Sequence, residues 1–150
     1  TLLDHLQAMY RKYGFIASAQ HACTLPGDAG ATQIQQIMRD LRRNPPTSIG
    51  GSPVVEIRDI EQGTRTNLVT GEVSKETLPQ SNVLAMRLDT GERVLARPSG
   101  TEPKIKFYFE ARIQMNEDMS MQQVEAKANR RIEVLKSDLI DERFPILAGC

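Results

Sequence analysis

Three stretches of the chain repeat apolar residues at the spacing of a helix face. The first is residues 1–14, the second lies between residues 28 and 44, and the third begins at residue 120. Apolar residues that recur every three or four positions form one stripe, so the pattern predicts three amphipathic helices. The apolar positions of the three stripes are Leu2, Leu3, Leu6, Met9, Tyr10 and Tyr13, then Ile34, Ile37, Met38 and Leu41, then Met121, Val124, Ala128, Ile132, Leu135 and Leu139.

The ends of the second and third helices carry recognisable signals. Ser120 followed by Gln123 is the pattern of a capping box, in which each side chain bonds the other residue's amide. Asp28 or Thr32 is expected to cap the second helix, because both side chains accept hydrogen bonds from free amides. That helix is expected to end at the Asn-Pro-Pro sequence of residues 44–46, since proline cannot continue it.

The middle of the chain alternates apolar and polar residues, which predicts strands. The clearest alternation covers residues 104–112, and further strands are predicted at 53–60, 82–89 and 92–98. Thr90-Gly91 between the last two predicts a hairpin. Residues 63–80 are expected to form a long loop with a small hairpin around Thr70-Gly71, and residues 47–53 a flexible link. The apolar positions of the 104–112 strand are Ile105, Phe107, Phe109 and Ala111.

This order of elements predicts the fold class. Residues 27–144 run helix, strands, helix, which is typical of an α+β domain whose antiparallel, roughly four-stranded sheet is flanked by two helices. Residues 1–26 cannot bury a core of their own. We expect them to be the tail of a preceding domain with a hinge, in a chain cut from a longer protein. Residues 145–150 are expected to be a tail.

Charge and cysteine content exclude several classes of protein. The 150 residues include 19 basic and 19 acidic side chains, so no global field attracts nucleic acid or anionic membrane. No apolar run approaches the roughly 18 residues of a membrane span. The two cysteines, Cys23 and Cys150, lack the number for a disulfide scaffold and the spacing of a zinc site. We therefore expect a reduced, cytoplasmic setting.

Residues 97–106 concentrate groups that bind anions. A glycine at position 100 permits positive φ, so backbone amides can converge on an ion. Neighbouring hydroxyls can donate to phosphate oxygens, an arginine offers a planar fork, and a lysine adds a point charge. Proline, serine and glycine are equally typical of a plain surface turn, so composition alone leaves both interpretations open. The candidate residues are Arg97, Ser99, Gly100, Thr101, Lys104 and Lys106.

The string RPSGTEPKIKFYFE at residues 97–110 resembles the phosphate-binding loop in the C-terminal domain of the phosphohexomutases. These form the phosphoglucomutase and phosphomannomutase superfamily, and the chain looks most like the phosphoglucomutase-2 type. TLLDHLQAMYRKYG resembles the end of their third domain, and VVEIRDIEQG, NVLAMRLDTGERVLA and the closing helix follow in the family's order. The resemblance covers nearly the whole chain and is weakest in residues 63–80 and after residue 144.

The resemblance implies the last domain of a four-domain isomerase. In that family a phosphoserine on the first domain donates its phosphoryl group to a hexose phosphate. The bisphosphate reorients, and its other phosphate returns to the serine. The second domain binds Mg²⁺, a hexose bisphosphate is the activator, and the fourth domain grips the phosphate that does not react. Arg97, Ser99, Gly100 and Thr101 match its phosphate contacts, Lys106 matches a basic position, and Lys104 lies beside it.

The chain lacks the phosphoserine loop, the Asp-rich metal loop and the sugar-recognition loop of that family. We therefore assign no catalytic residue and no metal ligand, and expect the chain to bind phosphate without catalysis. The expected partners are a hexose phosphate and the remaining domains of the same enzyme, with no nucleic acid and no membrane. The alternative is a non-catalytic anion- or nucleic-acid-binding α+β module.

Several other polar residues are interpreted as structural. His5 and His21 have no partner at motif spacing, so we expect structural or solvent-facing roles. The acidic residues of the 53–61 region are expected to lie on the wet side of the sheet. The basic residues of the last helix alternate with acidic ones, which indicates a solvated face. These two groups are Glu56, Asp59 and Glu61, and Lys127, Arg130, Arg131 and Lys136.

Overall fold

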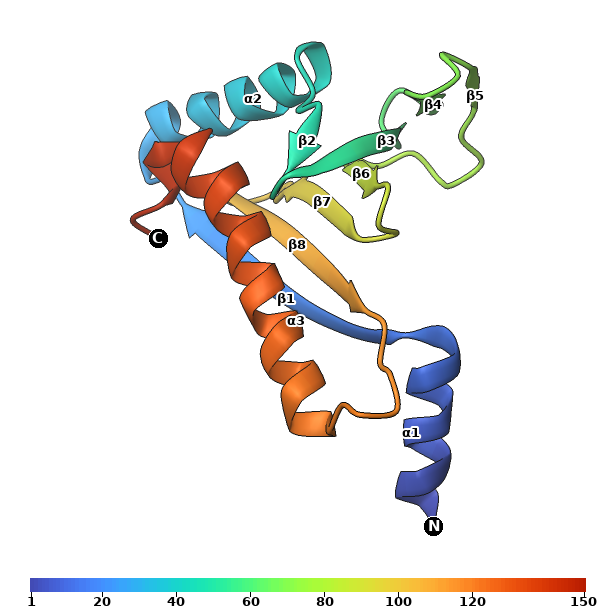
Figure 1. The fold of residues 1–150 in the computed structure, drawn as a ribbon. Coiled ribbons are helices and arrows are strands. Elements are labelled where there is room, and N and C mark those ends of the chain that lie inside the picture. The colour runs from blue at the N-terminus through green and yellow to red at the C-terminus, as the bar shows by residue number, and fades with distance from the viewer.

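The alternating segments form one eight-stranded antiparallel sheet in the computed structural model, which describes residues 1–150 (Figure 1). The neighbour order is β1-β8-β7-β6-β3-β4-β5, and β2 pairs with β3 outside this path. The α+β class is confirmed, although the sheet has more than the roughly four strands expected. The strands are β1 Phe15–Thr24, β2 Ser48–Ile49, β3 Ser52–Asp59, β4 Thr64–Asn67, β5 Val73–Lys75, β6 Leu84–Leu88, β7 Arg93–Pro98 and β8 Lys104–Ile113.

Strand β1 is one of the strands by which the sheet exceeds the expected number. The sequence indicated only a short extended stretch here, but β1 pairs with β8 through ten residues, from Phe15 opposite Ile113 to Thr24 opposite Lys104. It lies at the edge of the sheet and contains no Asp, Glu, Lys or Arg. Its small residues give only a weak alternation of apolar and polar positions. The division of the chain after residue 26 stays a prediction.

Two short hairpins supply the remaining strands. The hairpin expected around Thr70-Gly71 is confirmed, since β4 and β5 pair antiparallel there. The flexible link expected at residues 47–53 is wrong. Ile49 pairs with Ser52, and Gly50 and Gly51 between them have φ of 57° and 77°. Two consecutive left-handed residues make the tight turn that matches the twist of paired strands, and glycine adopts that conformation freely.

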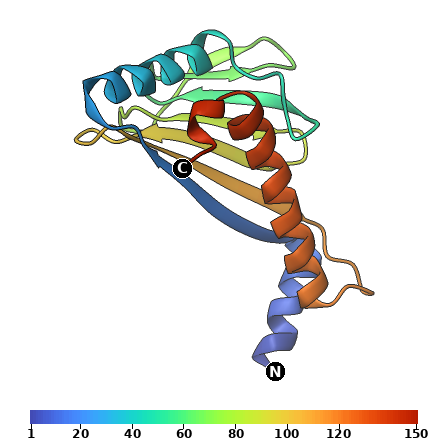
Figure 2. The same ribbon diagram turned by 90° about the vertical axis from the view of Figure 1, so that its left-hand side faces the viewer.

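The helices are α1 Leu2–Tyr13, α2 Gly27–Arg43 and α3 Met121–Lys136, followed by a π-helical turn at Ser137–Glu142 and a 3₁₀ turn at Pro145–Leu147. Helices α2 and α3 cover the same face of the sheet (Figure 2). The capping box of Ser120 and Gln123 is confirmed. The cap expected for α2 is wrong: Pro26 takes the N-cap position without a side-chain bond, because Asp28 and Thr32 already lie inside the helix.

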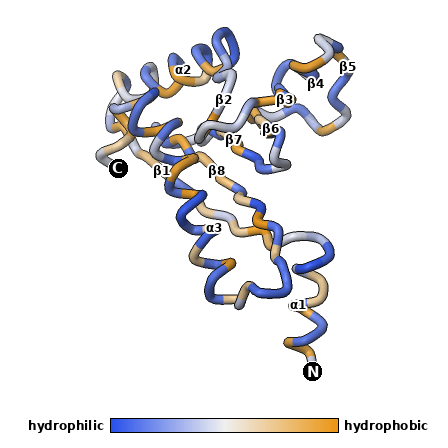
Figure 3. Tube along the Cα trace, in the orientation of Figure 1, coloured by the Kyte–Doolittle hydropathy of each residue, from blue (hydrophilic) through white to orange (hydrophobic).

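The core lies between α2, α3 and the sheet. The apolar positions of β8 are fully buried, as their alternation predicts, and Phe107 and Phe109 stack with ring centroids 6.5 Å apart. The hydropathy colouring shows apolar residues recurring along α2 and apolar residues mixed with polar ones along β8 (Figure 3). The buried residues that the helices contribute include Ile34, Ile37, Met38, Leu41, Val124, Ala128, Ile132 and Leu135.

Charged residues expected in solvent are partly buried instead. Arg131 of α3 donates to the carboxylate of Glu92 and to the carbonyl oxygen of Gly50, so it does not lie on a solvated face, whereas Lys127 and Arg130 are exposed as expected. Glu56 and Asp59 are also buried. Each accepts hydrogen bonds from an arginine of a neighbouring element, which compensates for the loss of water around the carboxylate.

Helix α1 projects away from the sheet (Figure 1). Thr1 caps it in a capping box with Asp4, and Tyr10 packs edge-on against Phe15 with centroids 5.1 Å apart. The rest of its apolar stripe has no partner: Leu2 is 86% exposed and Met9 is also exposed. No helix of the structure combines the length and apolar character that crossing a membrane requires.

The expectation of two separate reduced cysteines is wrong for this structure. Cys23 of β1 and Cys150 form a disulfide, with Cα atoms 5.2 Å apart. Residues 145–150, expected as a tail, instead pack on the core through buried Leu147. His21 is structural, as expected, because its buried Nε2 lies 3.0 Å from the carbonyl oxygen of Leu147 and donates to it.

Candidate functional site

The loop between β7 and β8 is held by its own hydrogen bonds. The Ser99 amide donates to the Lys104 carbonyl oxygen at 2.8 Å and closes the loop. The Ser99 hydroxyl oxygen accepts the amides of Thr101 and Glu102 at 3.4 and 3.3 Å. At the far end, the Pro103 carbonyl oxygen accepts the Leu25 amide at 2.9 Å. The loop is therefore anchored to both β8 and the end of β1.

Gly100 does not have the positive φ that the sequence analysis expected, so the argument that it forms a left-handed anion nest is wrong here. Gly100 contributes by leaving open space beside the loop backbone. A Cβ at this position would meet no atom within 4 Å, and the Gly100 amide has no partner among the hydrogen bonds of the loop. The Thr101 side chain is exposed. An approaching anion therefore meets an open amide and hydroxyl groups whose protons can still be donated.

Arg97 and Lys106 lie directly opposite each other in the β7–β8 pairing. Arg97 follows buried Ala96, and Lys106 lies between buried Ile105 and Phe107. Because side chains alternate along a strand, both cations project from the face that the helices leave open. Lys104 lies on the same face two residues earlier. The structure thus brings together the three cations proposed from sequence at the base of the loop.

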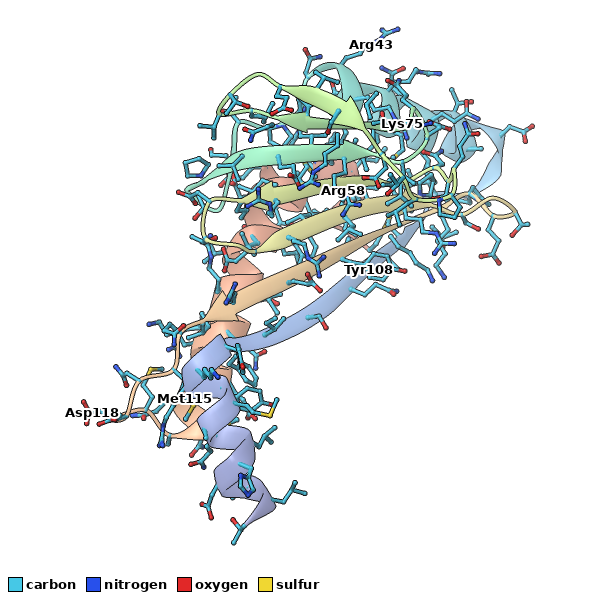
Figure 4. All side chains as sticks on the ribbon, turned by 90° about the vertical axis from the view of Figure 1, so that its right-hand side faces the viewer. Arg43, Arg58, Lys75, Tyr108, Met115 and Asp118 are labelled. Carbon is cyan, nitrogen blue, oxygen red and sulfur yellow. A yellow bond between two sulfur atoms is a disulfide. The ribbon has the colours of Figure 1, made fainter.

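Figure 4 shows this open face, on which four arginines have carboxylate partners, whereas Arg112 donates to the Tyr13 carbonyl oxygen instead. Arg58 pairs with Glu76 at 2.6 Å, Arg93 with Glu110, and Glu56 serves both Arg65 and Arg87. Arg97, Lys104 and Lys106 form no ion pair. Like charges directly opposite in a sheet repel, so these three cations favour an external anion.

The paired carboxylates show the electrostatic effect of such cations. Hydrogen bonding from Arg58 lowers the pKa of Glu76 to about 2, and the pKa of Arg58 is raised in turn by Glu76. Burial acts to raise the pKa of Glu56, but the hydrogen bonds from Arg65 and Arg87 outweigh it and the pKa is lowered. An anion beside Arg97 and Lys106 would be stabilised by the same interaction.

A hollow of about 480 Å³ is lined by Ser99, Gly100 and Thr101 of the same loop, but not by the three cations at its base. It is bounded by the loop and by the first turns of α2, whose amides have no side-chain cap. Asp28 and Glu102 line it, and no cation does. Because two carboxylates oppose a negative ligand there, the open face near Arg97 is the better place for an anion. Figure 2 shows the loop extending beside the start of α2.

Sequence reasoning missed two polar residues of this hollow, Gln35 and Asn82. Asn82 is positioned by Arg42, which donates to its side-chain oxygen at 2.6 Å and also bonds Asp59 at 3.0 Å. No local pattern could reveal this contact, because Arg42 and Asn82 are brought together only by the packing of α2 beside the sheet. Tyr108 lies on the open face, as its alternation with buried neighbours predicts.

The fold is an α+β domain in which the candidate loop, with three unpaired cations at its base, connects two antiparallel strands. The chain belongs to the phosphoglucomutase/phosphomannomutase family: residues 31–128 match the family described as "Phosphoglucomutase/phosphomannomutase, C-terminal domain". This match includes the whole candidate loop. It confirms the family that the resemblance indicated. The match begins at residue 31, so residues 1–30 lie outside it.

Relatives are similar over most of the chain. The phosphoglucomutase of Staphylococcus saprophyticus is 36% identical over 126 residues, which are 84% of this chain and 22% of that protein. The probable phosphomannomutase of Haemophilus influenzae is 35% identical over 112 residues, 75% of this chain and 20% of that protein. The open form of Paramecium parafusin, a phosphoglucomutase structure, aligns with a TM-score of 0.48 and 16% identity over 91% of this chain and 23% of that one. The chain thus spans about a fifth of the length of its curated relatives.

Proposed function

We propose that this chain is the C-terminal domain of a phosphosugar mutase and binds the phosphate group of a hexose phosphate that is not being transferred. The observation that carries the proposal is the pair Arg97 and Lys106, which face each other on the open sheet without a carboxylate. Family membership supports the substrate class. The binding residues in this proposal are Arg97, Ser99, Gly100, Thr101, Lys106 and, beside them, Lys104.

Each group has a separate part in binding. The Arg97 guanidinium offers two parallel N–H groups to two phosphate oxygens, and Lys106 adds a charge from the neighbouring strand. The Gly100 amide and the hydroxyls of Ser99 and Thr101 donate to the remaining oxygens. Because the Ser99 oxygen already accepts two loop amides, the loop needs little reordering when the ligand arrives.

Phosphoryl transfer itself needs groups from elsewhere in the longer protein. No group of three or more His, Cys, Asp and Glu side chains in this chain could hold a metal ion, so the residues here do not fit Mg²⁺. We propose that the Mg²⁺ and the phosphoserine belong to other domains and that a hexose bisphosphate activates the whole enzyme. The chain alone is then inactive. A cytoplasmic location is part of the same proposal.

The domain division is also proposed. The exposed apolar stripe of α1, including Leu2 and Met9, fits a helix that packs against an upstream domain. Because β1 is paired with β8 along its length, we place the point of motion between α1 and β1. Amide exchange measured in the longer protein tests this: the β1 amides that point toward β8 should be protected, and residues 13–15 should exchange faster.

The phosphate site can be tested on this chain by NMR titration with inorganic phosphate and glucose 6-phosphate. We expect weak binding, because one phosphate is held without contacts to the sugar, and shifts centred on the amides of residues 99–106. Arg97→Ala should weaken binding about tenfold or more, since a charge-assisted hydrogen bond is worth about 1.5–3 kcal/mol. Arg87→Ala is the matched control, because Arg87 lies on the same face but shares the carboxylate of Glu56.

The alternative nucleic-acid function predicts a different result. A duplex binder would show affinity that falls steeply with salt, because several phosphates are contacted at once. Affinity for a DNA duplex above that for glucose 6-phosphate, or equal phosphate binding by wild type and Arg97→Ala, would contradict the proposed phosphosugar site.

A further inference from the structure

The disulfide between Cys23 and Cys150 joins two parts of the chain that are far apart in sequence. Cys23 lies near the end of β1 and is 1% exposed, whereas Cys150 is exposed. Their Cα atoms are 5.2 Å apart, within the range that a disulfide spans. A reagent in solution therefore reaches the bond from the side of Cys150.

The disulfide holds a segment that makes few other strong contacts. Residues 144–150, which we call the closing segment, follow the π-helical turn and contribute buried Phe144 and Leu147. Phe144 contacts Phe107 with ring centroids 6.4 Å apart. The Leu147 carbonyl oxygen accepts a hydrogen bond from Nε2 of the buried His21. The closing segment thus covers part of the core beneath β1 and β8.

The same end of β1 anchors the candidate phosphate loop. Cys23 pairs with Ile105 of β8, and two residues later the Leu25 amide donates to the Pro103 carbonyl oxygen at 2.9 Å. The Leu25 carbonyl oxygen lies only 1.9 Å from where a Cβ on Gly30 would stand, so the backbone at Leu25 is closely packed against α2. A continuous path leads from Cys150 through Cys23 and Leu25 to the loop.

We propose that Cys23 and Cys150 form a thiol–disulfide exchange site whose oxidised state fixes the closing segment and, through Leu25, the phosphate loop. The physiological reagents would be low-molecular-weight thiols and their disulfides. The part of the proposal that concerns anion affinity rests on the proposed function. The part that concerns the closing segment does not.

The exchange proceeds in two balanced steps. A thiolate attacks the exposed Cys150 Sγ and forms a mixed disulfide, while Cys23 leaves as a thiolate and takes up a proton. A second thiol molecule attacks the mixed disulfide, which frees the Cys150 thiol and releases the oxidised small molecule. Two thiols are oxidised to one disulfide as one protein disulfide is reduced to two thiols. The closing segment is then held only by Phe144, Leu147 and the His21 hydrogen bond.

The experiment compares the oxidised and reduced chain in glutathione buffers of different ratio. Intact mass after acid quenching and alkylation in denaturant counts the free thiols, including that of buried Cys23. Amide exchange follows Leu25 and Leu147, and a titration with inorganic phosphate follows the loop. We expect no free thiol in the oxidised chain and two in the reduced chain. On reduction, exchange at both amides should rise about tenfold or more, and phosphate affinity should fall about twofold to fivefold, because the loop is less preorganised.

Variants separate the exchange site from general effects of the reductant. Cys150→Ser should behave as the reduced wild type in both buffers, and Ala148→Ser in the same segment should keep the wild-type response. Free thiols in the oxidised buffer, or equal exchange at Leu25 and Leu147 in both states, would overturn the proposal. Changed exchange with equal phosphate affinity would overturn the coupling to the loop. Changed exchange with no phosphate binding in either state would refute the proposed function and support the exchange site.

Discussion

The guanidinium of Arg131 and the carboxylate of Glu92 form a two-pronged ion pair between α3 and the β6–β7 turn. Arg131 Nε lies 3.1 and 3.0 Å from the two Glu92 oxygens, and Nη2 lies 2.8 Å from Oε2. Glu92 is 2% exposed. Arg131 also bonds the Gly50 carbonyl oxygen at 2.6 Å and the Ser52 hydroxyl at 2.8 Å. One side chain therefore links a helix to two hairpin turns.

Loss of this arginine should destabilise the domain strongly. Arg131→Ala leaves Glu92 buried without its cation, which typically costs about 3–5 kcal/mol. Urea unfolding gives the free energy of each variant. Arg130→Ala is the control: Arg130 is the exposed neighbour, and its loss should change stability by less than about 0.5 kcal/mol. Similar stability of the two variants would show that the ion pair contributes little.

Glu76 should make the stability of the β4–β5 region depend on acid pH. Its pKa is lowered by hydrogen bonding from Arg58, from the ordinary 4.5 to about 2. A carboxyl with a depressed folded-state pKa contributes stability above pH 4.5 and loses it as pH falls toward 2. Thermal midpoints of Glu76→Gln should therefore approach those of the wild type as pH falls over this window. Glu72→Gln, at an exposed position of the same hairpin, should keep a constant difference from the wild type.

Gly30→Ala should destabilise the chain although alanine is the better helix former. Alanine is favoured over glycine in a helix by about 1 kcal/mol. Here its Cβ would stand 1.9 Å from the Leu25 carbonyl oxygen, which forces a backbone shift and costs about 1–3 kcal/mol. Gly149→Ala, where no atom lies within 4 Å, should be neutral by the same unfolding measurement. A more stable Gly30→Ala would mean that Leu25 moves freely.

Arg97 should act on substrate affinity in the full-length enzyme. A grip on a phosphate that stays bound throughout contributes equally to the ground and transition states, so Arg97→Ala should raise KM strongly with little change in kcat. Arg97→Lys should restore part of the affinity, because a point charge cannot replace the planar fork. We expect a loss of about ten- to a hundredfold in kcat/KM for the alanine variant. Steady-state kinetics within about twofold of wild type would fit a plain surface turn instead.

The chain alone should not interconvert glucose 1-phosphate and glucose 6-phosphate. Without a phosphoserine donor and a metal site, the groups that stabilise phosphoryl transfer are missing. A coupled assay with Mg²⁺ and glucose 1,6-bisphosphate checks this, and the longer protein serves as the positive control. Turnover by the purified chain would contradict the assignment of catalysis to other domains.

Local pattern predicted the elements that are regular in sequence. Strand β8 was predictable because each of its buried residues alternates with a polar one, and α2 and α3 because their stripes are continuous. Strand β1 was not, since its small residues Ala17, Ser18 and Ala19 give no clear period. The Cys23–Cys150 bond spans 127 positions, and the Arg131–Glu92 pair connects separate elements. Such contacts depend on tertiary packing, which a local pattern does not contain.

The candidate site was likewise predictable from the sequence only in part. Its cations and hydroxyls follow from the residue types of 97–106, and the facing of Arg97 and Lys106 follows once β7 and β8 are in register. The position of Gln35 and Asn82 beside the loop depends on how α2 sits against the sheet. The conformation of Gly100 was wrongly expected, because glycine permits positive φ without requiring it.

Strand β1 has a consequence for the order of events during synthesis. Its pairing partners in β8 lie between 80 and 98 positions later in the chain. A ribosome therefore releases β1 well before β8 exists, and the strand must wait unpaired while the intervening hairpins form. Such long-range pairing slows folding, because the chain entropy is lost before the contact forms. We expect β1 to join the sheet last, after the hairpins of β3 to β7 are already in place.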